Sequence, residues 1–374
     1  MSGIYIHIPF CKQACSYCDF YFVTRTSERE HFVERLVEDI KSYRDSRFAR
    51  ERVETIYFGG GTPSLLEPAQ LEQIMKALYD VFDIGEQEIT LEMNPDDVSA
   101  PFLADLKSLG ISRASMGVQS FEPDLLEFMH RAHSSEEALQ CLELLSASDF
   151  NSFTVDLIYG NPGQSVEQLE RDVKKLLEFN PPHISAYSLT IEPKTRLGKQ
   201  VELGRIAPPE DDKVAKHFDI INQLFSSQGI ERYEVSNYSI PGKEAIHNSN
   251  YWEHENYLGL GPGAHSFWWD DKAERWENEK DLRKYLRDED HPEKEVLSLK
   301  QLAEERLMMG LRTKKGVRVA ELSEQYDYEL SDRQLNYLEN REQEGKVNVD
   351  ERIILTDEGI KIADAIILDL VTLH

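Results

Sequence analysis

The sequence predicts an α/β protein that begins with a partial barrel of six parallel strands, (β/α)6, and ends with a helical, winged-helix-like α+β domain. Short apolar runs alternate with longer amphipathic stretches over the first 190 of the 374 residues. From about residue 298 the chain instead has the pattern of several helices and a short pair of strands. Strand–helix alternation is typical of parallel sheets with right-handed crossovers. Six such units are too few for a closed eight-stranded barrel, so we expect an open one.

The expected barrel elements follow one another in regular alternation. The strands are the short apolar runs at residues 4–8, 53–58, 88–92, 114–118, 153–158 and 183–189. The helices show apolar residues at three- and four-residue spacing and lie at 29–47, 70–81, 101–109, 136–145 and 166–177. Because the carboxyl ends of parallel strands share one edge, the segments that follow the strands should meet there. Those segments are the cysteine-rich loop and residues 59–63, 92–95, 119–120 and 156–163.

The alternation stops near residue 190, where prolines and glycines mark a connecting stretch. Beyond it we expect a helix at 212–228, and strands and turns in the aromatic-rich residues 246–269. The C-terminal elements should be helices at 300–311, 318–326 and 332–344, a two-stranded wing at 347–355 and a helix from 357 to about 370. We therefore divide the chain into a barrel at 1–195, a connecting segment at 196–295 and a C-terminal domain at 296–374.

The charge balance excludes two classes of partner. Lys and Arg number 42 and Asp and Glu number 69, which gives a net charge of −27. Broad nucleic-acid grooves and general adsorption to anionic lipid both depend on clustered Lys and Arg. No long apolar run or signal peptide is evident in the sequence, so we expect a cytoplasmic protein, with peripheral membrane association left open.

Three of the four cysteines lie within eight residues of one another. Cys11, Cys15 and Cys18 form a C-x3-C-x2-C pattern, whereas Cys141 lies on the apolar face of an expected helix and is assigned to the core. In a reducing compartment, clustered cysteines are more often metal ligands than disulfides. Zinc needs four ligands and no partner motif follows nearby, whereas three thiolates suit an iron–sulfur cluster with one open iron.

With Tyr17 before its last cysteine, this motif resembles that of the radical S-adenosylmethionine (SAM) enzymes. The glycine-rich segment at 59–63 also resembles theirs. Further stretches, at 5–11, 58–63, 117–121 and 156–160, resemble the oxygen-independent coproporphyrinogen III oxidase group over nearly the whole chain. The resemblance implies a [4Fe–4S] cluster on the three cysteines and SAM on its open iron. It assigns SAM contacts to residues matched by motif, namely Tyr5, Tyr17, Gly60, Gly61, Thr62, Glu92, Gln119, Arg131 and Asp156.

Two departures from the oxidase pattern favour the related haem chaperones. The oxidases carry a fourth cysteine where this chain has Phe20, and a long N-terminal extension where ten residues precede Cys11. A third feature, the HNxxYW motif from His247 to Trp252, is associated in the chaperones with haem binding. A neutral imidazole is a common axial ligand of haem iron. The resemblance therefore implies that haem binds near His247.

Two functions remain open from the sequence. The first is a haem chaperone that passes haem to haem proteins, including membrane-bound respiratory ones. The second is an oxidase that decarboxylates coproporphyrinogen III by radical chemistry, which requires an electron donor. Whether the chain is an enzyme, whether SAM is cleaved and whether the chain forms a homodimer are also left open. A third interpretation, a winged-helix regulator that binds DNA, conflicts with the net charge of −27.

Overall fold

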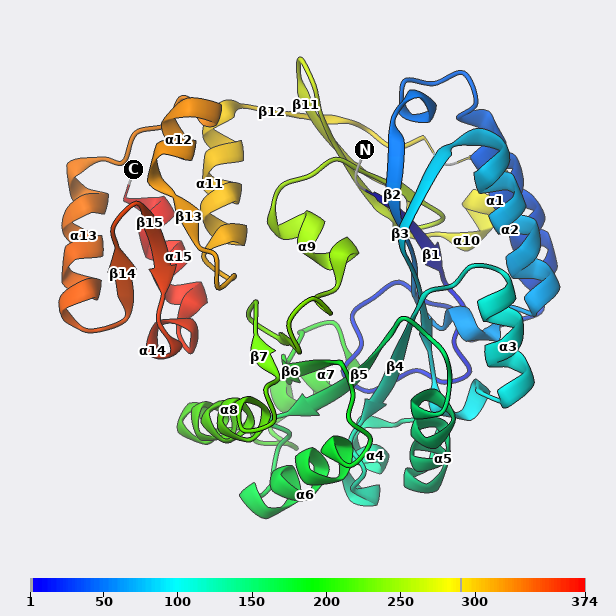
Figure 1. The fold of residues 1–374 in the computed structure, drawn as a ribbon, viewed down its shortest axis with the longest axis horizontal. Helices are drawn as coiled ribbons and strands as arrows, with labels where there is room; N and C mark the ends of the chain where they lie inside the picture. The colour runs from blue at the N-terminus through cyan, green and yellow to red at the C-terminus, as the bar shows by residue number, and fades with distance from the viewer. Residues whose placement is uncertain (1–2, 290, 374) are drawn as a thin grey trace.

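Six parallel strands form the centre of the structure and confirm the predicted α/β class. The computed structural model describes residues 3–289 and 291–373 and is drawn in Figure 1. The six strands pair side by side in chain order, with Ile6 opposite Phe58 in the first pair. They are β1 (Gly3–Ile8), β2 (Arg52–Gly60), β3 (Asp83–Met93), β4 (Arg113–Gln119), β5 (Ser152–Tyr159) and β6 (His183–Ser188).

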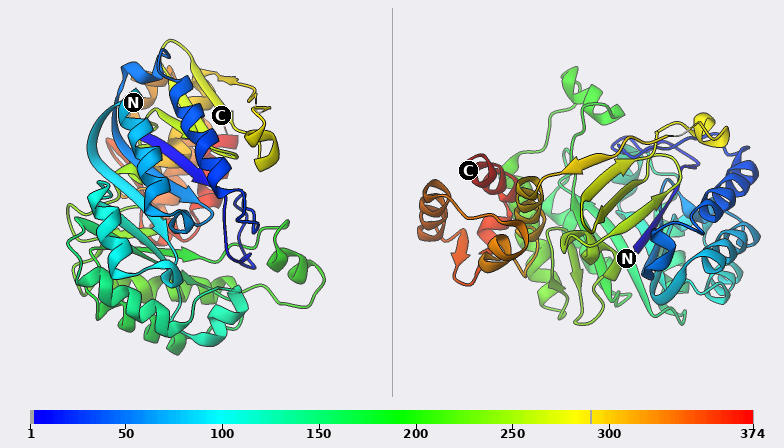
Figure 2. Two further views of the ribbon diagram at one scale, coloured as in Figure 1. Left: turned by 90° about the vertical axis from the view of Figure 1, so that its right-hand side faces the viewer. Right: turned by 90° about the horizontal axis from the view of Figure 1, so that it is seen from above.

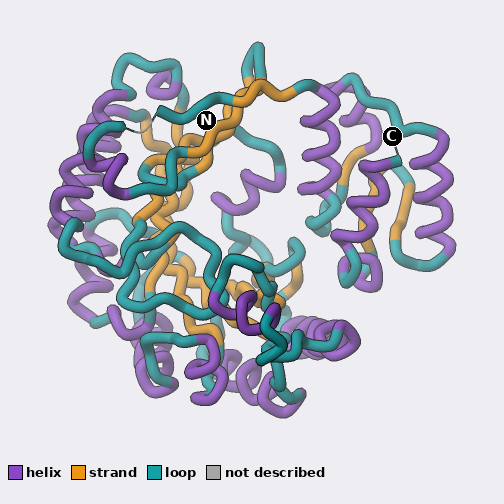
Figure 3. Tube along the Cα trace, turned by 180° about the vertical axis from the view of Figure 1, so that it is seen from behind, coloured by secondary structure: helices purple, strands orange, loops and turns teal. Residues whose placement is uncertain are grey.

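Amphipathic helices cover the outside of these strands, as Figure 3 shows from behind. Their apolar faces bury the core, and side-chain caps such as Ser134 and Ser165 satisfy the free amides where α5 and α6 begin. The predicted helices are α1 (Arg29–Ser42), α2 (Pro68–Val81), α3 (Ala100–Ser108), α5 (Ser135–Ser146) and α6 (Val166–Leu177). The expected extension of the first helix to residue 47 is wrong, because residues 44–47 are all polar and offer no apolar face to bury. The short helices that were not predicted include α4 (Pro123–Met129), α7 (Arg196–Glu202) and α10 (Leu282–Leu286).

The sheet is larger than the sequence predicted, because short strands extend it on both sides. Next to β1 lie β9 (Tyr257–Leu260), β10 (His265–Trp269), β11 (Ala273–Glu277) and β12 (Glu295–Leu297). Next to β6 lie β8 (Asn237–Ser239) and β7 (Glu231–Arg232), preceded by the predicted helix α8 (Asp211–Ser226). These strands have two to five residues and, except for the parallel β1–β9 pair, run antiparallel. Runs this short carry little periodicity: six strands were located individually and further ones were expected only within residues 246–269, whereas the described residues contain twelve strands in this sheet.

The C-terminal domain has the predicted helices, α11 (Leu299–Gly310), α12 (Val319–Tyr326) and α13 (Asp332–Gln343). The expected two-stranded wing, β14 (Val347–Val349) and β15 (Arg352–Leu355), gains a third strand, β13 (Val317–Arg318). The expected last helix is divided into α14 (Asp357–Ile360) and α15 (Ala363–Thr372). Figure 2 shows this domain to one side of the barrel and the segment with α7 standing out from it. Among the described residues, none of the helices is both long and apolar enough to span a membrane.

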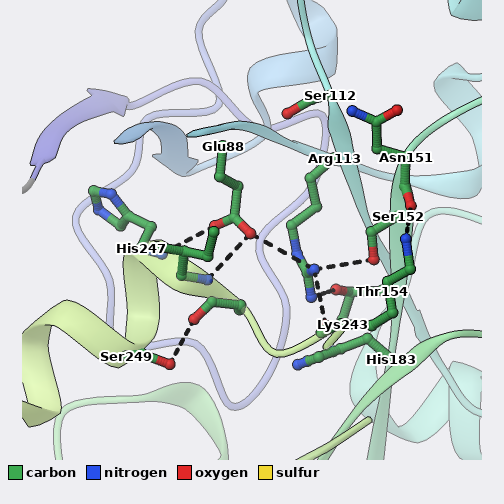
Figure 4. Close-up of polar contacts among 12 residues, drawn as sticks. Glu88, Ser112, Arg113, Asn151, Ser152, Thr154, His183, Lys243, His247 and Ser249 are labelled. Atoms are coloured by element: carbon green, nitrogen blue, oxygen red, sulfur yellow. Dashed lines mark hydrogen bonds and ion pairs between the residues drawn. The ribbon is translucent and has the colours of Figure 1, made fainter. Parts of the chain in front are cut away.

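The HNxxYW motif forms a helix, α9 (Ile246–Trp252), which corrects the expectation of strands and turns for residues 246–252, whereas β9 and β10 confirm it for the rest of residues 246–269. The helix lies between the sheet and the C-terminal domain (Figure 1). Its sequence, Ile-His-Asn-Ser-Asn-Tyr-Trp, contains no strong helix former, so propensity alone does not predict it. Tertiary contacts supply the missing stability: the Glu88 carboxylate accepts the amides of Ile246 at 3.1 Å and His247 at 3.0 Å (Figure 4).

Glu88 belongs to a buried charge network that links α9 to the sheet. Its carboxylate lies 3.7 Å from the Arg113 guanidinium, and both residues are almost fully buried. Arg113 in turn donates to the Ser152 hydroxyl at 3.1 Å and the Thr154 hydroxyl at 2.6 Å, as Figure 4 shows. Each charge is therefore compensated, which a buried ion requires.

Replacing Glu88 with alanine should destabilise the fold strongly. The substitution leaves Arg113 buried without its opposite charge and frees two amides of α9, so the expected loss in the free energy of unfolding is about 3–5 kcal/mol. Chemical denaturation of the purified protein measures it. The control is Asp149→Ala, which breaks the exposed Lys107–Asp149 pair at 3.4 Å. The control should change stability by under about 0.5 kcal/mol; equal losses in the two variants would contradict the role given to Glu88.

Candidate functional site

The cysteine-rich loop leaves the carboxyl end of β1 and is held by backbone hydrogen bonds. The Cys11 amide donates to the Val23 carbonyl at 3.0 Å, and the Val23 amide donates to the Pro9 carbonyl at 2.7 Å. In the middle of the loop, the Ser16 amide donates to the Met129 carbonyl at 3.0 Å. Met129 is the last residue of α4, so this unpredicted helix supports the loop.

The three thiols of this loop line one cavity and are partly exposed. Among the described residues, no three His, Cys, Asp or Glu side chains are grouped closely enough to hold a single metal ion. The donor set consists of three thiolates, one too few for a closed tetrahedral zinc site, and it suits a multi-iron cluster in which each thiolate binds a different iron. Burial raises the pKa of Cys11 to about 11 and that of Cys18 to about 12. Binding of an iron–sulfur cluster to these cysteines must therefore release their thiol protons.

The glycine-rich segment at the end of β2 packs directly on the cysteine loop. Gly60 has φ +104°, and a Cβ atom there would lie 2.5 Å from the His7 ring. A Cβ atom on Gly61 would lie 2.7 Å from the carbonyl oxygens of Ile8 and Phe10. Only glycine accommodates these close approaches. The next residue, Thr62, points its hydroxyl at the Cys11 sulfur, 3.7 Å away.

Glu92 and Tyr57 form a buried polar pair beside the glycine segment. The Glu92 carboxylate accepts the Tyr57 hydroxyl at 2.7 Å and the Gly60 amide at 3.1 Å. Burial raises the pKa of Glu92. The carboxylate is therefore held in place before any ligand binds.

Arg131 connects the cysteine loop to the strand ends. Its guanidinium donates to the Asn94 side-chain oxygen at 2.7 Å and to the Gly117 carbonyl at 2.8 Å. The same group lies 3.3 Å from the Cys15 sulfur and 3.4 Å from the Tyr17 hydroxyl. The Arg131 side chain therefore ties the middle of the cysteine loop to the segments that follow β3 and β4.

Three buried polar atoms around this cavity have no hydrogen-bond partner in the described part of the chain. They are Gln119 Oε1, Arg131 Nε and Asp156 Oδ1. Gln119 also has φ +70°, a backbone conformation that side chains rarely adopt. Buried groups of this kind are normally paired, and strained residues cluster at functional sites. The residues therefore fit a polar ligand that offers amino, carboxylate and hydroxyl groups, as SAM does.

Most of the predicted site residues meet in this cavity, which has a volume of about 470 Å³. We call it the cluster cavity. The predicted residues that line it are Cys11, Cys15, Tyr17, Cys18, Gly60, Gly61, Thr62, Glu92, Gln119, Arg131 and Asp156. The other two predicted residues, Tyr5 and His247, line a second cavity, which also touches Gly60 and Glu92.

The cluster cavity is also lined by residues that were not predicted as site residues, among them Asn94, Ser115 and Tyr187. Asn94 accepts from Arg131 and donates to the Thr62 hydroxyl at 3.2 Å. Asn94 lies in the segment after β3, which was expected at the shared edge of the strands. Its place in the site could therefore have been predicted from the sequence. Ser115 and Tyr187 could have been found from the two-residue period of a strand, which places them on the inner face of β4 and β6.

His247 is a buried residue with both ring nitrogens engaged. Nδ1 lies 2.8 Å from the Thr55 hydroxyl, and Nε2 lies 2.8 Å from the Tyr251 hydroxyl. The ring stacks on Tyr57, and burial lowers the pKa of His247 to about 3, so the imidazole is neutral. In this arrangement it has no free nitrogen for an iron. Its predicted contact with haem stays a prediction, and coordination would require loss of one of these hydrogen bonds.

Comparisons with known proteins agree with this geometry. Residues 5–176 match the model of the radical SAM superfamily, and residues 297–362 match that of the HemN C-terminal domain. The chain is 35% identical over 371 residues to the heme chaperone HemW of Lactococcus lactis, covering 97% of this chain and 95% of that protein. It is 39% identical over 267 residues to the heme chaperone HemW of Escherichia coli, covering 70% of this chain and 69% of that protein.

A solved structure shows the same fold. The radical SAM coproporphyrinogen III oxidase HemN from Escherichia coli aligns with a TM-score of 0.83 and 22% identity, over 99% of this chain and 90% of that chain. At this identity the likeness concerns the fold alone. The identity to the HemW proteins extends over nearly the whole chain, and on that basis the chain belongs to the HemW family of radical SAM proteins.

Proposed function

We propose that this protein is a haem chaperone, which binds haem and delivers it to haem proteins, built on a radical SAM scaffold. The observation that carries the proposal is the second cavity, which has mainly apolar and aromatic walls and adjoins the cluster cavity at Gly60 and Glu92. A flat, apolar macrocycle suits such walls. The names of the HemW relatives support the same function.

The cluster cavity supplies the protein groups for a [4Fe–4S] cluster and SAM. Cys11, Cys15 and Cys18 would hold the cluster, whose open iron would bind the amino and carboxylate groups of SAM. Arg131, beside the Cys15 sulfur, offsets the negative charge of the thiolates. Glu92 and Asp156 offer carboxylate oxygens to hydroxyl or cationic groups of SAM.

The residue at the position of the fourth cysteine favours the chaperone over the oxidase. Phe20 lines both cavities, and its side chain is 71% exposed. Single exposed apolar side chains are common on protein surfaces, but this one stands where the two cavities adjoin. We infer that Phe20 packs against the bound cargo, in a place where the oxidases carry a polar thiol.

The first test concerns the cluster ligands. Cys11→Ala should lose most of the iron and sulfide that the wild-type protein takes up on anaerobic reconstitution, because one of three protein ligands is missing. Iron and sulfide assays measure the uptake. Cys141→Ala is the matched control, since Cys141 is buried away from the cavity and should keep the wild-type content. Equal uptake by Cys11→Ala and wild type would disprove the assignment.

The second test concerns Asp156 and pH. Burial, followed by the nearby Glu92 charge, raises the pKa of Asp156 to about 7, while the Ser185 hydroxyl, Arg131 and Arg113 act in the opposite direction. The carboxyl is thus neutral below about pH 7 and ionised above it, and the ionised form accepts hydrogen bonds and attracts the sulfonium of SAM. SAM affinity should therefore rise as pH increases through about 7, and Asp156→Asn should reduce this dependence.

Equilibrium dialysis of SAM with the reconstituted protein at pH 6 and pH 8 measures the effect. Protonation changes of SAM itself affect the measured affinity of every variant equally, so they cancel when the variants are compared. The control is Asp172→Asn, which alters a buried carboxyl outside the cavity whose pKa burial raises to about 6. A pH dependence that survives in Asp156→Asn would remove this residue from the SAM site.

The third test separates chaperone from oxidase. Reconstituted full-length protein is incubated anaerobically with reductant, SAM and coproporphyrinogen III, and separately with haem and then an apo-haem protein. We expect haem binding and transfer, and no catalytic formation of protoporphyrinogen. Protoporphyrinogen formation over many turnovers would identify an oxidase and overturn the proposal, as would failure to bind haem.

A further inference from the structure

A second cavity of about 660 Å³ lies between the sheet and the C-terminal domain; we call it the interdomain pocket. Its walls come from α9 and the residues after it, from β9, β10 and β11, and from α11. The volume falls within the roughly 300–1,000 Å³ of cofactor and ligand sites. Phe267, Met308 and Met309 contribute apolar surface, and Arg275 and Lys280 bring positive charge that haem propionates could share. The proposed function places haem here without naming a ligand to the iron.

Four histidines line the interdomain pocket: His7, His247, His254 and His265. His7, like His247, has both ring nitrogens engaged, with the Tyr21 carbonyl at 2.8 Å and the Tyr5 hydroxyl at 3.2 Å. His265 is half exposed, and its Nε2 lies 3.2 Å from the Glu277 carboxylate on the neighbouring strand. The rings of His7 and His247 therefore have both nitrogens bound to protein groups. The ring of His265 pairs with Glu277 at the solvent-exposed edge of the pocket.

His254 differs from the other three. Its ring is 5% exposed and stacks on Phe267, with 4.6 Å between ring centroids. Nδ1 lies 3.4 Å from the Tyr326 hydroxyl, which orients the ring from the C-terminal domain. Nε2 is buried and forms no hydrogen bond of good geometry among the described residues, and its one ion-pair contact there is with the Glu305 carboxylate at 3.5 Å. A buried nitrogen without a partner is unusual unless a ligand completes it.

The surroundings of Nε2 suit coordination of haem iron. A ligating histidine typically keeps its proton on the other nitrogen, where a protein group accepts it, and the Tyr326 oxygen is placed to do so. Glu305 already forms an ion pair with Arg275 at 2.6 Å, so it keeps a partner when it moves away from His254. Met308 and Met309, on α11 beside Glu305, supply soft, adaptable apolar contacts for a macrocycle.

We propose that His254 Nε2 is an axial ligand of the haem iron in the interdomain pocket. In the bound form the Nε2 lone pair would make the bond to the iron and the ring would keep its proton on Nδ1, so no electron is transferred. This inference rests on the proposed function, since it names the iron ligand of the same cargo. It also gives the C-terminal domain a role, because Tyr326 and Glu305 both belong to that domain.

The backbone at His254 offers a clean substitution. His254 has φ +62°, a left-handed conformation that glycine adopts without strain. His254→Gly therefore removes the ring without a backbone penalty and leaves a space that free imidazole can fill. Asn180→Gly is the matched control, because Asn180 is also left-handed, with φ +48°, and is not among the residues of either cavity.

The experiment is an anaerobic titration of each reconstituted full-length variant with haem, followed by the Soret band, and with metal-free protoporphyrin IX, followed by fluorescence. We expect His254→Gly to weaken haem binding by roughly tenfold or more and to shift the Soret band. Added imidazole should restore the wild-type spectrum, and protoporphyrin affinity should stay unchanged. Asn180→Gly should match the wild type for both ligands.

The outcomes separate this inference from the proposed function. Wild-type haem affinity and spectrum in His254→Gly would overturn the ligand assignment while leaving the chaperone function intact. Parallel losses of haem and protoporphyrin in His254→Gly, without rescue by imidazole, would show a packing role and likewise overturn it. Absence of haem binding in the wild type would overturn the ligand assignment and the proposed function together.

Discussion

The site depends on the parallel pairing of β1 with β2, which continues past the ends of both strands. The Gly61 amide donates to the Ile8 carbonyl at 2.8 Å, and the Thr62 amide donates to the Phe10 carbonyl at 2.7 Å. These bonds place the cysteine loop on the glycine segment with no side chain between them. A Cβ atom at Gly61 would collide with the backbone oxygens that accept these bonds, so one pairing explains both the glycines and the position of the thiols.

Buried charge is the second constraint on the structure. Glu88 and Arg113 are almost fully buried, and the partly buried Arg131 and Asp156 line the cluster cavity, in a chain of net charge −27. Glu88 and Arg113 compensate each other and hold the start of α9, which makes them structural. Arg131 and Asp156 keep polar atoms without partners, which marks them as groups prepared for a ligand. Charged residues of the same types therefore contribute to stability where neighbouring groups complete their hydrogen bonds, and to binding where those hydrogen bonds are left for a ligand.

The two cavities adjoin each other, because Asp19, Phe20, Gly60 and Glu92 line both. Tyr5 and His7 face the interdomain pocket, while the loop that follows β1 carries the thiols. Glu92 and Gly60 line both cavities. A cargo in the pocket would consequently lie beside SAM and the cluster, and Phe20 would contact the region between them. The C-terminal domain completes the pocket through α11, so the barrel alone offers only part of the cargo site.

The sequence by itself determined the six-stranded α/β alternation, the cysteine loop and the strand-end residues from Gly60 to Asp156. These features depend on local periodicity and on the rule that parallel strands share one edge, both of which can be read along the chain. Only the tertiary structure decided that residues 246–252 form a helix, because Glu88, more than 150 positions earlier, caps it. The tertiary structure also decided which of two histidines has a ring nitrogen without a hydrogen bond. His247 and His254 lie seven residues apart and cannot be told apart from the sequence pattern. Their hydrogen-bond partners come from distant elements, Thr55 of β2 for His247 and Tyr326 of α12 for His254. Hydrogen-bond partners across such separations are set by packing, which no local pattern contains.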